Sequence, residues 1–217
     1  MHVFLIASVP LAYVYLLVLR EQTGRTSAMT AVPALKGALA YLILLVPLLL
    51  MRRFVARPYD GAGLYLYASV YDYVLPVLLL FALYLRFTRD VGGLTADERF
   101  LSLVSFYAGA FALAGVLDLF LRADYHGPYE LFMLPALRIG VMLILPSLYY
   151  QFSTETFWVR YLYLGLIAAL PWVTGFVPLL SAMYLGLFAA LLTGLLFFGG
   201  LAVAYLASGG PNRYRLG

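Results

Sequence analysis

Residues 31–51 read AVPALKGALAYLILLVPLLLM, an apolar run whose one charge is Lys36. The hydrocarbon core of a bilayer is about 30 Å thick and takes about 20 helical residues to cross, so a run of this length predicts a transmembrane helix. Similar runs occupy most of the chain on both sides of this one, with short charged loops between most of them. The expected spans lie near residues 2–19, 31–51, 64–87, 98–121, 129–151, 157–175 and 177–207.

The composition agrees with a membrane protein. Hydrophobic residues make up 65% of the chain and charged residues 11%, whereas soluble domains average about 45–50% apolar and about 25% charged residues. The expected fold is therefore an all-α, polytopic helical bundle of about seven transmembrane helices, forming a single transmembrane domain over residues 1–217. A count of six stays open, because no charge separates the last two runs, which would then form one long, broken helix.

The basic residues indicate how the chain is oriented. The net charge of +4 comes mainly from Lys and Arg side chains near the ends of the runs, and cytoplasmic loops accumulate such residues. An outside N-terminus and an inside C-terminus place nine basic residues on the cytoplasmic side and four on the other. We expect this N-out, C-in orientation and a multi-pass position in the cell membrane. The lipid bilayer is then the principal partner, and no nucleic-acid partner is expected.

Two short patterns predict where helices begin. Thr95-Ala-Asp-Glu98 has the spacing of a capping box, in which the Thr hydroxyl and the Glu carboxylate accept hydrogen bonds from backbone N–H groups. Ser153 and Thr154 precede another apolar run, so their hydroxyls are expected to cap the first turn of the sixth helix. Glu155 would favour the positive end of that helix.

Asp72 and Arg138 are the charges that lie well inside apolar runs. One such charge at a helix centre costs about 2.5–3.5 kcal/mol, and an oppositely charged partner offsets much of that cost. Both residues lie at similar depth in their expected spans, so we predict that they pair near mid-membrane. Pro76 and Pro135 flank the two positions, and broken helices with ionisable groups near the midplane are typical of transporter binding sites. A buried ion pair that only fixes helix packing is the alternative.

Asp118 is a third candidate for this ligand- or ion-binding site. It stands four residues before Arg122 near the outer end of its run, and an ion pair within one helix is the simplest expectation at that spacing. If the long side chain of Arg138 reaches outward, Asp118 instead extends the polar centre to three residues.

A loop on the expected outer side carries Asp124, His126 and Glu130. These side chains suit acid–base chemistry or the binding of a metal ion. However, three residues of these types are often found within one short loop by chance, and Glu130 is also suited to capping a helix. We therefore expect no metal and no cofactor, and keep these residues as a catalytic alternative. The sequence lacks the HExxH, GxSxG and phosphate-loop motifs, which argues more against an enzyme than for one.

The last run carries a ridge of small residues at four-residue intervals. Such a ridge lets another helix approach closely, either inside the protein or at an interface with a partner membrane subunit or a second copy. The ridge consists of Ala182, Gly186, Ala190 and Gly194.

The favoured hypothesis is a transporter-like protein, or a membrane-embedded subunit of a larger transport or translocation complex, with Asp72 and Arg138 at its polar centre. One alternative is an intramembrane lipid-modifying enzyme that uses Asp124, His126 and Glu130. Another is a seven-helix sensor that lacks its own output domain.

Overall fold

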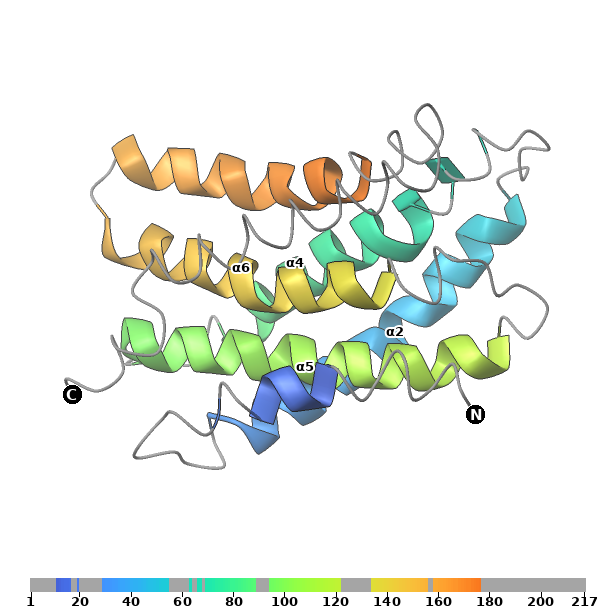
Figure 1. The fold of residues 1–217 in the computed structure, drawn as a ribbon, viewed down its shortest axis with the longest axis horizontal. Coiled ribbons are helices and arrows are strands. Elements are labelled where there is room, and N and C mark those ends of the chain that lie inside the picture. The colour runs from blue at the N-terminus through green and yellow to red at the C-terminus, as the bar shows by residue number, and fades with distance from the viewer. Residues whose placement is uncertain are drawn as a thin grey trace.

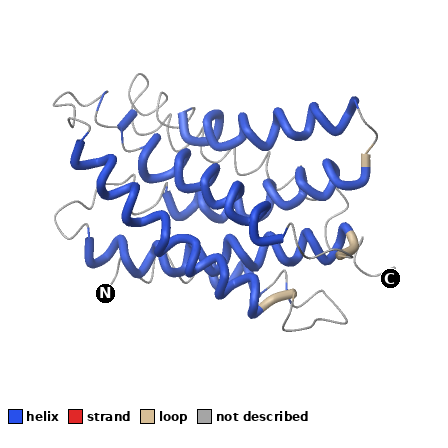
Figure 2. The backbone as a smooth tube through the Cα atoms, turned by 180° about the vertical axis from the view of Figure 1, so that it is seen from behind, coloured by secondary structure: helices blue, strands red, loops and turns tan. Residues whose placement is uncertain are grey.

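The computed structural model describes residues 11–16, 19, 29–54, 63, 66–67, 69–88, 94–121, 134–155 and 158–176. These residues form helices and the turns beside them, with no strand among them, so the all-α prediction is confirmed for the described part of the chain (Figures 1 and 2). The elements are α2 (Ala31–Phe54), the π-helical turn η1 (Val70–Val74), α4 (Leu75–Thr88), α5 (Ala96–Leu121), α6 (Leu134–Thr154) and a further helix, Trp158–Phe176.

Four helices within the described residues are long and apolar enough to cross a membrane: Ala31–Met51, Val70–Thr88, Ala96–Leu117 and Trp158–Phe176. They coincide with four of the predicted spans. This bundle of apolar helices fits an integral membrane protein. The predicted span at 129–151 appears as α6, which is long enough but is not one of the four. The span at 177–207 and most of the one at 2–19 lie outside the described residues, so the helix count and the orientation stay predictions.

The capping box at the start of α5 is confirmed. The backbone N–H of Thr95 donates to Oε2 of Glu98 at 2.7 Å, and the N–H of Glu98 donates to Oγ1 of Thr95 at 3.3 Å. The two side chains thus satisfy two of the backbone donors that every helix start leaves without an intrahelical partner. This local pattern fixes where α5 begins.

The expected cap at Ser153 and Thr154 was wrong, because α6 continues through both residues. The hydroxyl of Ser153 donates to the carbonyl of Tyr149 at 2.8 Å, and that of Thr154 donates to the carbonyl of Tyr150 at 3.2 Å. The hydroxyls therefore donate to carbonyls in the last turn of α6. The same side chain can act at either helix end, since a hydroxyl both donates and accepts.

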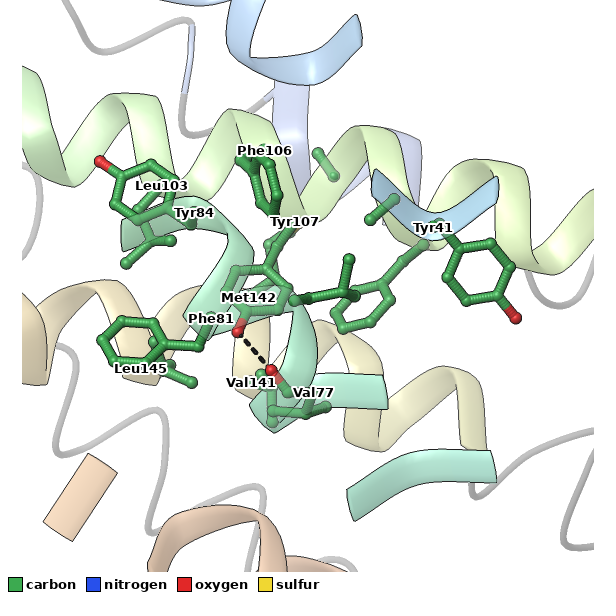
Figure 3. Close-up of a cluster of buried hydrophobic side chains, with 14 of the residues drawn as sticks. Tyr41, Val77, Phe81, Tyr84, Leu103, Phe106, Tyr107, Val141, Met142 and Leu145 are labelled. Atoms are coloured by element: carbon green, nitrogen blue, oxygen red, sulfur yellow. Dashed lines mark hydrogen bonds between the residues drawn. The ribbon is translucent and has the colours of Figure 1, made fainter. Parts of the chain in front are cut away.

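The core of the bundle lies around α5. In the membrane-length window of α5, 72% of the residues are buried, against 28% for α2 and 22% for Trp158–Phe176. Figure 3 shows part of this core, which also includes Leu11, Tyr73 and Ile167 from neighbouring elements. Its labelled members are Tyr41 from α2; Val77, Phe81 and Tyr84 from α4; Leu103, Phe106 and Tyr107 from α5; and Val141, Met142 and Leu145 from α6.

The outer face of α2 is apolar and exposed. Leu35, Ile43 and Val46 are 63%, 59% and 60% exposed, whereas the buried positions of α2, such as Tyr41, Leu44 and Leu48, form one stripe at helical spacing. A soluble protein rarely leaves so much contiguous apolar surface open to water. The exposed side chains are suited to contact with lipid.

α2 and α5 cross at two glycines. A methyl group added at Gly37 would overlap the carbonyl of Phe106, and one added at Gly109 would overlap the carbonyl of Ala34. The two backbones are therefore in direct contact, which is how small residues allow helices to associate in a membrane, where lipid is as apolar as the side chains. α2 crosses α5 obliquely at this point (Figure 1).

Gly37→Ala and Gly109→Ala should each destabilise the protein by about 1–3 kcal/mol or more, because the added methyl meets backbone that cannot move as a side chain can. The measurement is the thermal unfolding temperature of the detergent-solubilised protein. Gly165→Ala is the matched control, since nothing lies within 4 Å of the added methyl. If Gly37→Ala and Gly109→Ala unfold at the same temperature as the wild type and Gly165→Ala, the glycine crossing is not required for stability.

Candidate functional site

Asp72 lies on the π-helical turn η1, at the start of the helix that continues as α4. The backbone N–H of Leu75 donates to the carbonyl of Val70, five residues back, in place of the α-helical partner four residues back. Asp72 is half-buried as a residue, and its Oδ1 atom is buried. Single π-helical turns within α-helices occur frequently at functional sites.

Pro76 gives a physical reason for this wide turn. Proline has no backbone N–H, and in a regular α-helix its ring would clash with the carbonyl four residues earlier, here that of Asp72. A π turn contains one more residue than an α turn and moves that carbonyl away from the ring. The proline that was predicted to break this helix is therefore accommodated by a π turn, on which the buried carboxylate lies.

Two polar contacts join η1 to the end of the Trp158–Phe176 helix. The hydroxyl of Tyr73 lies 2.6 Å from Oγ1 of Thr174. The hydroxyl of Ser69, just before η1, donates to the carbonyl of Gly175 at 3.4 Å. Ser69, Tyr73 and Thr174 are all buried, so the contacts are made away from solvent.

Arg138 lies one turn into α6 and is buried, with 5% of its side chain exposed. Its guanidinium carbon lies 5.9 Å from the centre of the Phe111 ring on α5. A cation at this distance from an aromatic face is attracted by the electrons of the ring, by about 2 kcal/mol when water is excluded. The attraction to Phe111 thus offsets part of the free-energy cost of placing the Arg138 charge among apolar helices.

Aromatic rings connect Arg138 with the far end of α6. Successive ring centres are between 5.3 and 6.1 Å apart, within the range in which such pairs attract each other. At the far end, the guanidinium carbon of Arg160 lies 4.4 Å from the centre of the Phe152 ring. The rings between the two arginines belong to Phe152, Tyr149, Tyr84, Phe106, Tyr107 and Phe111.

α6 packs against η1, so Asp72 and Arg138 lie on neighbouring elements. A direct ion pair between these two side chains stays a prediction. Asp118 lies within α5 as expected, but its side chain is outside the described residues. The loop residues Asp124, His126 and Glu130 and the ridge Ala182, Gly186, Ala190 and Gly194 also lie outside them.

Sequence reasoning missed three residues around the site. Phe111 was one apolar residue among many, and its position relative to Arg138 depends on how α5 packs against α6. Tyr73 and Thr174 are 101 residues apart in the sequence, so no local pattern could have paired them. A usable signal existed for Tyr73 alone, since it adjoins Asp72 and a buried tyrosine hydroxyl requires a hydrogen-bond partner.

Asp72→Asn, Arg138→Gln and the double variant test the predicted pair. Each single variant should lower the thermal unfolding temperature modestly, because it leaves the other charge buried without its opposite. The double variant should lose less than the sum, by a coupling free energy of about 0.5–3 kcal/mol. Losses that add within about 0.5 kcal/mol would show that the two side chains do not interact.

No protein-family model matches this chain, and no curated protein or solved structure is significantly similar to it.

Proposed function

We propose that this protein is a transporter, or the membrane-embedded subunit of a transport or translocation complex, and that its substrate or coupling ion binds at Asp72 and Arg138. The observation that carries the proposal is that two opposite charges lie inside apolar helices, on elements that pack against each other. Ionisable groups inside a membrane are costly, and they mark substrate paths, ion paths and proton relays.

The π turn favours a binding role over a purely structural ion pair. A structural pair needs only two facing side chains on regular helices. Here the helix continues through the charge but widens to a π turn from Val70 to Val74, followed by Pro76. Single π turns within helices are frequent at functional sites, which supports a binding role for the carboxylate on this one.

The orientation that we propose places the start of α5 in the cytoplasm. Lys36, Arg86, Arg99 and Arg160 belong to helix ends on that side of the bundle: the starts of α2, α5 and Trp158–Phe176, and the end of α4. In the whole sequence, nine basic residues lie on this side and four on the other, and an excess of this kind is typical of the cytoplasmic side. The sequence has no nucleotide-binding loop, so transport would use an ion gradient or a partner protein that hydrolyses a nucleotide.

Native mass spectrometry of the protein, gently extracted from its own membrane, tests the proposal. We expect a bound small molecule or ion on the wild-type chain, or reproducible additional subunits. In the first case Asp72→Asn and Arg138→Gln should lose the added mass while the folded yield stays nearly unchanged, because each substitution removes a charge that contacts the ligand and keeps a polar side chain in its place.

Asp97→Asn is the matched control, since Asp97 is an exposed carboxylate in the first turn of α5 and should keep the bound mass. A bare monomer, or an added mass that survives both site substitutions, contradicts the proposal. So does recovery of folding only in the double variant, because the charges would then serve structure alone.

A further inference from the structure

The Trp158–Phe176 helix is attached to the bundle along a narrow stripe. Its buried positions include Ile167, Pro171, Thr174 and Gly175 at helical spacing, and most of its other residues are exposed. Toward its end, this stripe meets η1. The helix therefore contacts the turn that carries Asp72 at the point where its own burial is greatest.

The hydroxyl of Thr174 makes hydrogen bonds both within its own helix and to η1. The hydroxyl of Thr174 donates to the carbonyl of Leu170 at 2.8 Å. That hydroxyl also lies 2.6 Å from the hydroxyl of Tyr73, and either of the two can be the donor of the bond between them. Tyr73 is 1% exposed, so this hydrogen bond is made away from solvent, where losing a hydrogen-bond partner is costly.

The ring of Tyr73 packs against Gly175, where a side chain would leave it too little room. A methyl group added there would lie 3.0 Å from Cδ1 of Tyr73 and 3.5 Å from Cγ2 of Val74. The first distance is tighter than ordinary van der Waals contact, so the ring would have to shift. The ring and the hydroxyl of Tyr73 are thus both positioned by the same end of the Trp158–Phe176 helix.

π-helical turns are rare, and an uncommon backbone geometry persists only where its surroundings hold it. If this turn changed to α geometry, the residues before it, and with them the Asp72 carboxylate, would rotate. We propose that Tyr73 and Thr174 are positioning residues of the site: their hydrogen bond holds the π turn and thereby sets where the Asp72 carboxylate lies. This inference rests on the proposed function, since Asp72 is a site residue only under it.

The test is the NMR signal of the Asp72 carboxyl carbon in the full-length protein labelled with ¹³C-aspartate, assigned by its absence in Asp72→Asn. Tyr73→Phe and Thr174→Val should both shift this signal, because either change removes the hydrogen bond. Thr174→Ser should restore the wild-type position, since serine keeps the hydroxyl. Gly175→Ala should shift it as well, by displacing the ring.

Tyr84→Phe is the matched control. The hydroxyl of Tyr84 donates to the carbonyl of Arg99 at 3.0 Å, and the residue is as buried as Tyr73, but it lies at the other end of α4. Both Tyr→Phe variants should lower the unfolding temperature by similar amounts, whereas only Tyr73→Phe should move the Asp72 signal. An unmoved signal in Tyr73→Phe and Thr174→Val, or an equal shift in Tyr84→Phe, overturns the inference.

This experiment is independent of the ligand. If Asp72→Asn keeps the bound mass in native mass spectrometry, the proposed function fails whatever the carboxyl signal shows. If the mass is lost in Asp72→Asn but the signal does not respond to Tyr73→Phe, the site stands and the positioning role fails. The two failures are therefore distinguishable.

Discussion

Direct backbone contact between α2 and α5 is the constraint on which the rest of the bundle depends. In lipid, apolar side chains gain little by leaving their solvent for one another, so helices associate through close packing and hydrogen bonds. Gly37 and Gly109 provide this contact, and α5 packs against α6 as well. α5 in turn carries Phe111, the ring beside Arg138. The surroundings of the buried Arg138 therefore depend on the close approach that Gly37 and Gly109 permit.

Around Asp72, local chain chemistry and tertiary contacts act together. Pro76 makes a regular α-helix unfavourable at this point, but it does not select among a kink, a break and a π turn. The contacts of Tyr73 and Ser69 with the Trp158–Phe176 helix accompany the π turn that is observed. A charge, a proline and a buried hydrogen bond thus lie within one short segment, where a membrane helix would otherwise be regular.

The parts of the fold that depend on neighbouring residues could be predicted from the sequence, and those that depend on distant residues could not. The Thr95–Glu98 capping box involves one turn and was confirmed. Ser153 and Thr154 are the last two residues of α6 and come shortly before the next helix, so the sequence alone does not show which helix end their hydroxyls serve. The burial of Arg138 followed from the cost of its charge. Small residues occur in several helices, so spacing alone could not show that Gly37 meets Gly109.

Both tryptophans of the chain, Trp158 and Trp172, lie on the Trp158–Phe176 helix. Trp158 is near the start of the helix and 82% exposed, whereas Trp172 is stacked on Phe176 with ring centres 5.6 Å apart, close to the contact with η1. Intrinsic tryptophan fluorescence therefore reports on this helix alone, without any introduced label. The wild-type chain carries its own optical probe of the element that touches the turn of Asp72.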